Sequence, residues 1–515
     1  MRKVLYILLL GPILLLTSCA TILGTSKQKV SIITPSSDAK IYVDDELVGT
    51  GDSIRVKIKK DLVGKQIRVE RDGYLPNYKA HLQSLRSPLY IMSVVPFAVL
   101  IYPPLYDVGP KAWKYEKSAR LMGNVKVQKK TPDLKYVYLK QSSFDVKKEN
   151  FKYISTYSKR YYYDKSPYNE AAAEKDVKID NSIFTDIINK SLKESGFIDT
   201  TKKILRNKQN TIYVNSKIEK INIYQVFSRN SATMYMPSFI VAEPEIKWSI
   251  VDSYDQEKYS KTLTLKSNEF VYVYNEDENK STLIKALDNA IELSFHQLLN
   301  ENEVQELLKI TNNEVTFDEK INIKNNSLGV SNIEEAMSAS ITIKHKDGHG
   351  SGFFISEDGY LITNYHVIAG AKDIKVITNS GVEHDAEIIR SNEVADLSLL
   401  KITPKSKVIT FKIPLEKNYG IGKGVYCVGT PTSAELGQTV SKGIISGVRK
   451  VEDLGFDWIQ TDVSVNFGNS GGPLIKENGE LLGVVNSKVV GMGVEGIAFA
   501  IPAKDIAELL QLDIK

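Results

Sequence analysis

The sequence has 515 residues, which is too long for a single hydrophobic core and predicts roughly three or four domains of about 150 residues each. Its contents of 42% hydrophobic and 25% charged residues are ordinary for a globular protein. The net charge of +5 is spread along the chain without a basic cluster in the sequence, so we expect no nucleic-acid partner.

The N-terminus has the three parts of a secretory signal peptide, predicted over residues 1–18. A basic start is followed by an apolar run from Val4 to Leu16 and then by LTSC. These four residues resemble a bacterial lipobox, which implies that the thiol of Cys19 is acylated and becomes the first mature residue. An uncleaved membrane anchor is the alternative, although the run is shorter than the ~20 residues that span a bilayer. We expect a lipid-anchored envelope protein at the outer membrane, facing the periplasm.

The chain has two cysteines, Cys19 and Cys427. Lipidation of Cys19 would leave no intramolecular disulfide, even though the compartment would permit one. Because Cys427 lies in an apolar run, we expect a small buried residue and not a reactive thiol.

Residues 19–86 are predicted to form a small β-sandwich after the anchor. Apolar and polar residues alternate here, and turn residues at Asp44–Asp45 and Gly49–Asp52 separate the runs. The alternating apolar positions are Ile41, Val43, Ile54, Val56 and Ile58. AKIYVDD, VGTG and RDGY resemble the PEGA module of bacterial surface proteins, and this resemblance implies a spacer or a wall-facing binding role.

Residues 87–121 begin with twenty residues without a charge, SPLYIMSVVPFAVLIYPPLY. The length would allow a membrane span, but four prolines would interrupt a helix. A membrane-surface hairpin, a buried core hairpin and a true span all stay open.

Residues 122–310 are predicted to form an α+β domain of unknown role. IFTDIINKSLKESGF places apolar residues on one helical face and ends at Gly196, while STLIKALDNAIELSFHQLL predicts a second amphipathic helix. Between them, EIKWSIVDS and YSKTLTLKS predict a hairpin around Asp255. The run RYYYDKSPY at 160–168 favours strand or core packing over an aromatic binding surface.

Residues 311–332 are a predicted polar linker, and three motifs follow in order: TNYHV, ADLSLL and GNSGG. With these motifs, residues 333–515 resemble the trypsin-like serine proteases, and within them the HtrA (Deg) family. The resemblance implies a double β-barrel. The whole chain is therefore expected to be a multidomain protein, mainly β with α+β parts.

The resemblance assigns a catalytic triad to His366, Asp396 and Ser470. A serine hydroxyl needs an imidazole to accept its proton, and a buried carboxylate must fix the tautomer of that imidazole. The oxyanion hole is assigned to the turn of Gly468, Asn469 and Ser470, in which the amides of Gly468 and Ser470 point at the developing charge and Asn469 helps to fix the turn. An inactive relative that has kept these groups is the alternative.

The residues just before the nucleophile are expected to form the floor of the primary substrate pocket. They are Ser464, Val465 and Asn466, with Asn486 beginning the wall. None of them carries a carboxylate, so the analogy favours substrates with a small or medium apolar residue before the cut.

We expect neither cofactor nor metal. His345 and His349 are four residues apart, but the glycines around them favour strand and turn over a metal-binding helix. The chain stops at Lys515, soon after a predicted terminal helix, so no PDZ domain is expected. Protein or peptide substrates are the expected partners, and a homo-oligomer stays open. Two functions compete: an envelope serine endopeptidase, possible in protein quality control, and a non-catalytic lipoprotein that binds partners through its protease-like barrel and PEGA-like module.

Overall fold

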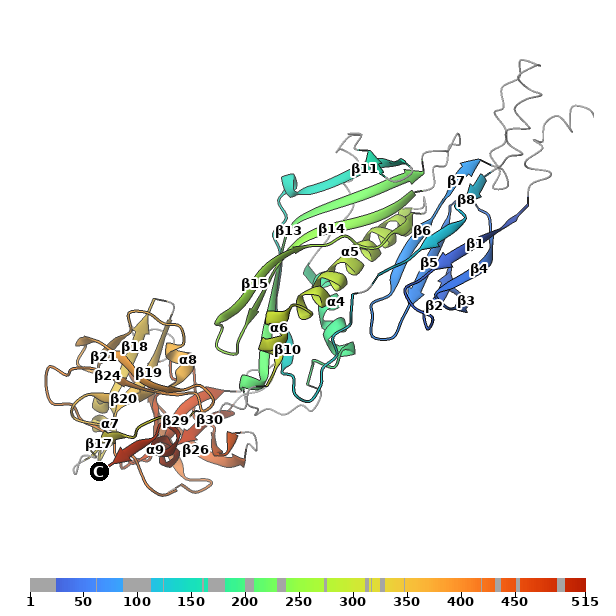
Figure 1. Cartoon of the computed structure of the whole chain (residues 1–515). Helices are drawn as coiled ribbons and strands as arrows, with labels where there is room; N and C mark the ends of the chain where they lie inside the picture. The colour runs from blue at the N-terminus through green and yellow to red at the C-terminus, as the bar shows by residue number, and fades with distance from the viewer. Residues whose placement is uncertain are drawn as a thin grey trace, which may run out of the picture. The chain divides into compact units, whose positions relative to one another are not determined.

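A computed structural model describes most of the chain as two compact units (Figure 1). The described residues are 25–61, 63–86, 113–123, 125–159, 162–164, 181–199, 208–228, 238–272, 276–310, 315, 317–324, 329–346, 348–417, 419–430, 437–450, 454–488 and 496–515. The first unit holds the described residues up to Asp199 together with Ile212–Val251 and Glu257–Lys309. The second holds those of Thr200–Thr211, Asp252–Gln256 and Ile310–Lys515.

The first unit opens with a β module, blue in Figure 1, made of two sheets and a strand pair. In one sheet β1 lies antiparallel to β4 and parallel to β9; the other has the order β3-β2-β5-β6; β7 pairs with β8. The strands are β1 (Lys27–Ile33), β2 (Lys40–Val43), β3 (Glu46–Thr50), β4 (Ser53–Lys59), β5 (Lys65–Glu70), β6 (Asn77–His81), β7 (Gln83–Arg86), β8 (Trp113–Tyr115) and β9 (Ser118–Arg120).

Alternation along these strands directs one side of each sheet into a shared core. Ile32, Ile41 and Ile67 are fully buried there. The expected turn at Asp44–Asp45 joins β2 to β3, and both aspartates have positive φ, as the two central residues of a type I′ hairpin require.

The β module extends beyond its predicted end at residue 86. Strands β8 and β9 fall in the segment 87–121, and Tyr115, Ala119 and Leu121 are buried in the module's core. These three residues come soon after the apolar run, and β8 and β9 are only three residues long. Their alternation was therefore not recognised in the sequence. The run at 87–106 and the signal sequence with Cys19 lie outside the described residues. No helix in the described part of the chain is both long and apolar enough to cross a membrane.

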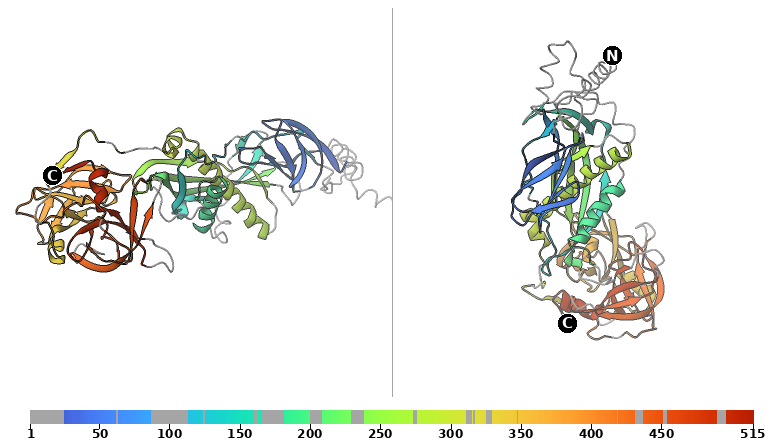
Figure 2. Two further views of the ribbon diagram at one scale, coloured as in Figure 1. Left: turned by 90° about the horizontal axis from the view of Figure 1, so that it is seen from below. Right: turned by 90° about the vertical axis from the view of Figure 1, so that its right-hand side faces the viewer.

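The rest of the first unit is a seven-stranded sheet with two long helices (Figure 1, Figure 2). Its main path is β12-β11-β13-β14-β15, with β10 beside β13 and β16 beside β14. The elements are β10 (Tyr136–Phe144), η2 (Lys148–Asn150), β11 (Phe151–Lys159), β12 (Tyr162–Asp164), α4 (Asn181–Glu194), η3 (Lys208–Asn210), β13 (Thr211–Ser228), β14 (Ser238–Val251), β15 (Glu257–Thr264), β16 (Phe270–Tyr272), α5 (Glu276–Leu299) and α6 (Asn302–Leu308).

The two helices pack where the sequence pattern predicts. Phe184, Ile188 and Leu192 of α4 are buried, and Gly196 follows the helix with φ +76°. Helix α5 packs on β14, where the indole N–H of Trp248 donates to Ser294 Oγ at 2.8 Å.

The second unit contains two β structures, gold and orange to red in Figure 2. The first is a seven-stranded sheet in the order β22-β21-β18-β19-β20-β24-β23, and the second is a closed barrel, β25-β26-β27-β30-β29-β28. The elements are β17 (Ile321–Ile323), α7 (Ile333–Ala339), β18 (Ser340–His345), β19 (Gly348–Phe354), β20 (Tyr360–Thr363), α8 (Tyr365–Ile368), β21 (Lys375–Thr378), β22 (Glu383–Asp385), β23 (Glu387–Asn392), β24 (Leu397–Lys401), β25 (Gly424–Gly429), β26 (Thr439–Lys450), β27 (Asp457–Thr461), β28 (Pro473–Ile475), β29 (Leu481–Lys488), β30 (Ala498–Pro502), η6 (Ala503–Asp505), α9 (Ile506–Leu509) and β31 (Leu512–Ile514).

The segment 311–332, expected to be a linker, contains a strand of this unit. Strand β17 pairs in parallel with β31 near the C-terminus, and Ile323 is buried in the core. The Arg390 guanidinium also donates to Glu319 O at 2.7 Å. Three strand residues among polar neighbours are too few to show alternation, so the sequence pattern missed the pairing.

Candidate active site

His366 lies on α8, a single helical turn directly after β20. Its side chain is 28% exposed, so one edge of the ring is open to solvent. Asn364, the residue before α8, is fully buried, and its Nδ2 donates to the backbone oxygen of Asp396 at 2.8 Å. This bond ties the start of the helical turn to the loop that carries the carboxylate.

Asp396 lies in the turn between β23 and β24, and its carboxylate is held by three donors. Oδ1 accepts from the backbone amide of His366 at 2.8 Å, and Oδ2 bonds His366 Nδ1 at 2.7 Å. Oδ2 also accepts from Asn486 Nδ2 at 2.8 Å. Asp396 is buried, and its φ of +56° is unusual for a residue other than glycine. Aspartate adopts this left-handed conformation more readily than most residues, and Asp44, Asp45, Asp255 and Asp373 also have positive φ.

This arrangement fixes the tautomer of His366. An ionised carboxylate can only accept hydrogen bonds, so Nδ1 must carry the proton that it shares with Asp396. Nε2 is then left as the acceptor on the exposed side of the ring. The structure thus brings together two of the three residues predicted for the triad.

Ser470, the third, is turned away from the imidazole. Its Oγ donates to the backbone oxygen of Asn486 at 2.9 Å, and within the described residues no hydrogen bond joins it to His366. The sequence predicted a serine with its base in hydrogen-bond reach. In this conformation the hydroxyl proton points to Asn486, and a rotation about the Cα–Cβ bond must come before proton transfer.

The turn before Ser470 requires a glycine at position 468. Gly468 has φ +98°, and a Cβ there would collide with the backbone oxygen of Thr430. In the described part of the chain, neither its amide nor that of Ser470 donates to a protein acceptor. The amide of Asn469 is already bonded to Asn466 O at 3.0 Å. Two amides therefore remain available for an oxyanion, with Asn469 supporting the turn.

Ser351 on β19 holds this turn, and sequence reasoning missed it. Its Oγ donates to Gly468 O at 2.7 Å and accepts from the Thr430 amide at 2.9 Å, while its own amide donates to Ser470 O at 2.9 Å. Ser351 is fully buried. The signal in the sequence was the small-residue run GHGSG, which allows β19 to approach the turn closely.

The residues predicted to form the substrate pocket lie in different surroundings. Ser464 and Asn466 are exposed, whereas Val465 is buried in the barrel core. Asn486 is 1% exposed, and its side chain donates to Asp396. The wall expected after it lies partly outside the described residues, which end at 488 here.

An exposed aromatic residue, Phe467, stands beside the turn and was not predicted. It is 73% exposed and meets His349 edge to face, with ring centroids 5.7 Å apart. His345 and His349 themselves lie on the β18–β19 hairpin. Cys427 is buried in the barrel, and burial raises the pKa of its thiol to about 12, which makes it unreactive near neutral pH.

Comparisons with known proteins place this site in a recognised class. Residues 350–484 match the family model described as a trypsin-like peptidase domain. Serine protease HTRA1 of Xenopus tropicalis is 40% identical over 167 residues, which are 31% of this chain and 35% of that protein. A probable periplasmic serine endoprotease, DegP-like, of Rhizobium meliloti (strain 1021) is 41% identical over 173 residues, 32% of this chain and 33% of that protein. The solved structure of the serine endoprotease from Yersinia pestis matches 35% of this chain and 65% of that chain at 34% identity, with a TM-score of 0.30.

This chain spans about a third of the length of the curated relatives it matches. The predicted trypsin-like peptidase domain, with its similarity to HtrA and DegP proteases, is confirmed for the C-terminal third. The lipobox and the PEGA-like module stay predictions.

Proposed function

We propose that this chain is a serine endopeptidase that cleaves proteins through an acyl-enzyme. The observation that carries the proposal is the buried Asp396 carboxylate, which holds both the backbone amide and Nδ1 of His366. A buried carboxylate that holds both the amide and Nδ1 of a partly exposed histidine is the arrangement that general-base catalysis requires. The position of this pair in a domain similar to trypsin-like peptidases supports the same conclusion.

In the first half of the reaction, Ser470 Oγ leaves Asn486 O and turns to His366 Nε2. It attacks the carbonyl carbon of the scissile bond while Nε2 takes its proton. The carbonyl oxygen becomes an oxyanion that accepts from the amides of Gly468 and Ser470. Nε2 then gives the proton to the leaving amine, the C–N bond breaks, and an ester joins the acyl group to Ser470.

The second half repeats these steps with water. Nε2 takes a proton from a water molecule as its oxygen attacks the ester, and the same two amides hold the second oxyanion. Nε2 then returns the proton to Ser470 Oγ, and the carboxylic acid product leaves. Throughout, Asp396 stabilises the charged imidazolium without taking its proton.

A fluorophosphonate probe on the full-length chain tests the proposal. We expect the probe to form a covalent adduct on Ser470, located by peptide mass spectrometry, and Ser470→Ala to abolish it. Ser380→Ala is the matched control because Ser380 is an exposed serine outside the site. If the wild-type chain neither cleaves casein nor reacts with the probe, the alternative function is favoured. In that case the chain is a non-catalytic lipoprotein that binds a partner through the same barrel.

The proposed substrates carry a small or medium apolar residue before the cut. The support is that none of Ser464, Val465 and Asn466 carries a carboxylate. A carboxylate there would be needed to pair with a basic side chain of the substrate. Cleavage of a randomised peptide library, read by mass spectrometry, tests this. Cuts that follow lysine or arginine as often as alanine or valine would overturn it.

We also propose that acylation of Cys19 holds the enzyme at the outer membrane, facing the periplasm, where misfolded envelope proteins would be its substrates. The support is the LTSC sequence and a relative that is named periplasmic. Radiolabelled palmitate should label the wild-type chain and not the Cys19→Ser variant. Label retained by that variant would overturn the assignment of the anchor.

A further inference from the structure

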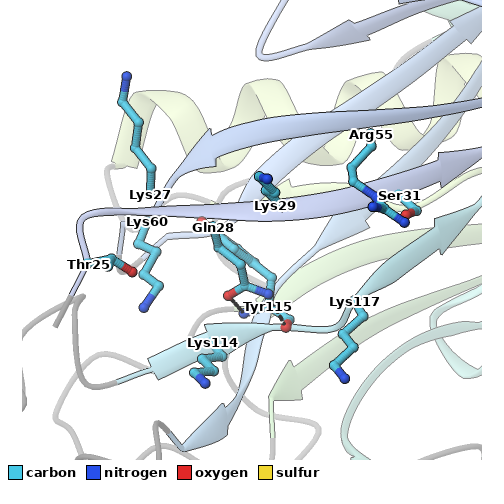
Figure 3. Close-up of a pocket in the computed structure, with 10 residues that line it drawn as sticks. All are labelled: Thr25, Lys27, Gln28, Lys29, Ser31, Arg55, Lys60, Lys114, Tyr115 and Lys117. Atoms are coloured by element: carbon cyan, nitrogen blue, oxygen red, sulfur yellow. Dashed lines mark hydrogen bonds between the residues drawn. The ribbon is translucent and has the colours of Figure 1, made fainter.

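A pocket of about 490 Å³ in the β module is lined by cations (Figure 3). Its volume is in the range typical of ligand sites. Five lysines and one arginine line it, and none of its other lining residues is acidic. The six cations are Lys27, Lys29, Arg55, Lys60, Lys114 and Lys117.

The fold assembles this pocket from residues far apart in the sequence. Ser31 and Arg55 are cross-strand partners on β1 and β4, and Lys27 and Lys29 lie at alternate positions of β1, on the same face as Ser31. The facing side comes from β8, where Tyr115 exchanges two hydrogen bonds with the Gln28 side chain, at 2.7 and 3.0 Å. The lining cations do not form a continuous basic run in the sequence, so the sequence pattern did not predict the pocket.

Two of the pocket's cations, Lys60 and Lys114, repel each other. Lys60 is only 5% exposed, and burial together with the charge of Lys114 lowers its pKa. The acidic residues next to the lining along the chain are Asp61 and Glu116, and neither lines the pocket; Asp61 is ion-paired with Lys65. Lys60 is buried and Lys114 half-buried, whereas the other four cations are exposed. Repulsion between Lys60 and Lys114 is unfavourable, and a bound anion would relieve it.

The pocket lies at the edge of the module where both candidate membrane segments join it. Thr25 lines the pocket and follows Cys19 by six residues. Six residues of extended chain span at most about 20 Å. The apolar segment that follows Arg86 returns at Trp113, and these two residues are paired between β7 and β8. Lys114 is the next residue and lines the pocket.

We propose that this pocket binds the phosphate of an anionic lipid headgroup and so orients the β module on the membrane. Lysine and arginine side chains give charge-assisted hydrogen bonds to phosphate oxygens, and basic residues near a membrane surface are attracted to anionic lipids. The ligand does not take part in proteolysis. The proposal rests on the membrane anchoring proposed above and not on the peptidase activity, because the pocket is separate from Ser470.

Native mass spectrometry of the full-length chain in detergent micelles tests this inference. Micelles doped with phosphatidylglycerol should give lipid adducts, and those doped with phosphatidylcholine should give about tenfold fewer. The triple variant Lys29→Gln, Arg55→Gln, Lys117→Gln should lose the phosphatidylglycerol adduct. The matched control, Lys126→Gln, Lys193→Gln, Lys247→Gln, removes three exposed charges elsewhere in the same unit and should keep it.

Three outcomes would overturn the inference. Equal adducts with the two lipids would remove the role of anionic charge, and equal loss in both triple variants would show a general charge effect. Displacement of the lipid by equimolar inorganic phosphate would assign the pocket to free phosphate. A photoactivatable phosphatidylglycerol gives a readout that needs no variant: crosslinks should fall in residues 25–31, 55–60 or 114–117, and crosslinks confined to other segments would contradict the proposal.

Discussion

The active site in the second unit and the basic pocket in the first differ in how their charges are satisfied. The Asp396 carboxylate has three hydrogen-bond donors from His366 and Asn486. The basic pocket has six cations and no acidic lining residue. The carboxylate of the first site is already held by donors before any ligand arrives, whereas no acidic side chain lines the second. Removing a polar group should therefore harm the first site and relieve the second.

The largest expected effect is that of Ser470→Ala, which tests the catalytic half of this comparison. We expect turnover of casein to fall by about 10⁶, the scale found when a triad nucleophile is removed. The fold should be unchanged, because within the described residues Oγ makes a single hydrogen bond, the one that it donates to Asn486 O. Circular dichroism checks the fold, and substantial residual cleavage by the variant would refute the assignment of the nucleophile.

Asp396→Asn asks whether the completed hydrogen bonds matter for the chemistry. An amide has one acceptor oxygen and one donor nitrogen, so it can no longer accept from all three donors: the backbone amide and Nδ1–H of His366 and Nδ2 of Asn486. We expect kcat to fall by about 10⁴ through the wrong tautomer of His366. Single-turnover kinetics measure this loss, and a variant of near wild-type activity would show that His366 needs no carboxylate.

Gly468→Ala tests the backbone of the oxyanion turn. The added Cβ would collide with Thr430 O and disfavour φ +98°, so the amide would move. Loss of one oxyanion donor lowers kcat by about 10²–10³. Gly422→Ala is the control, since Gly422 also has a positive φ but has open space around its Cβ position. Equal losses in both variants would point to general destabilisation.

A change of pH tests the β module, where a further positive charge should be unfavourable. Burial lowers the pKa of His81 to about 4, from a usual value of 6.5. Between these values the unfolded chain binds more protons, so stability is lost as pH falls from about 6.5 towards 4. At pH 5 this amounts to about 2 kcal/mol. Urea titrations followed by hydrogen exchange in β6 measure it, and His81→Gln should show a weaker pH dependence. An unchanged dependence would assign the acid sensitivity to other groups.

The smallest expected effect is a gain of stability in Lys114→Met. It tests directly whether removal of a cation stabilises the basic pocket. The change removes a charge that repels Lys60 while it keeps most of the aliphatic side chain. We expect the free energy of unfolding of the module to rise by about 0.5–1 kcal/mol in the absence of lipid. Urea unfolding monitored in the module's strands measures it. A loss of stability would mean that Lys114 is held by favourable contacts and that the pocket is not short of negative charge.

The sequence predicted those parts of the molecule that short stretches encode. The motifs TNYHV and ADLSLL predicted His366 and Asp396, whose side chains are hydrogen-bonded in the structure. Each motif could be recognised because such a turn restricts several neighbouring residues at once. The same reasoning missed the hydrogen bond from Asn486 to Asp396, two residues that are 90 positions apart in the chain. It also missed β17 and the basic pocket, which arise from pairing between distant strands. Such pairings depend on the tertiary fold and leave no local pattern.

The bond from Ser470 Oγ to Asn486 O sets a rotamer equilibrium for the nucleophile. A neutral hydrogen bond contributes a net 0.5–1.5 kcal/mol, so a hydroxyl with otherwise equal rotamers would face His366 for between about a third and less than a tenth of the time. Small electrophiles that touch little besides Oγ would be slowed by that fraction. A long polypeptide that contacts the neighbouring turn could shift the equilibrium by its own binding. Reaction rates with a small fluorophosphonate and with a peptidyl phosphonate, compared at equal occupancy, would reveal whether substrate length selects the reactive rotamer.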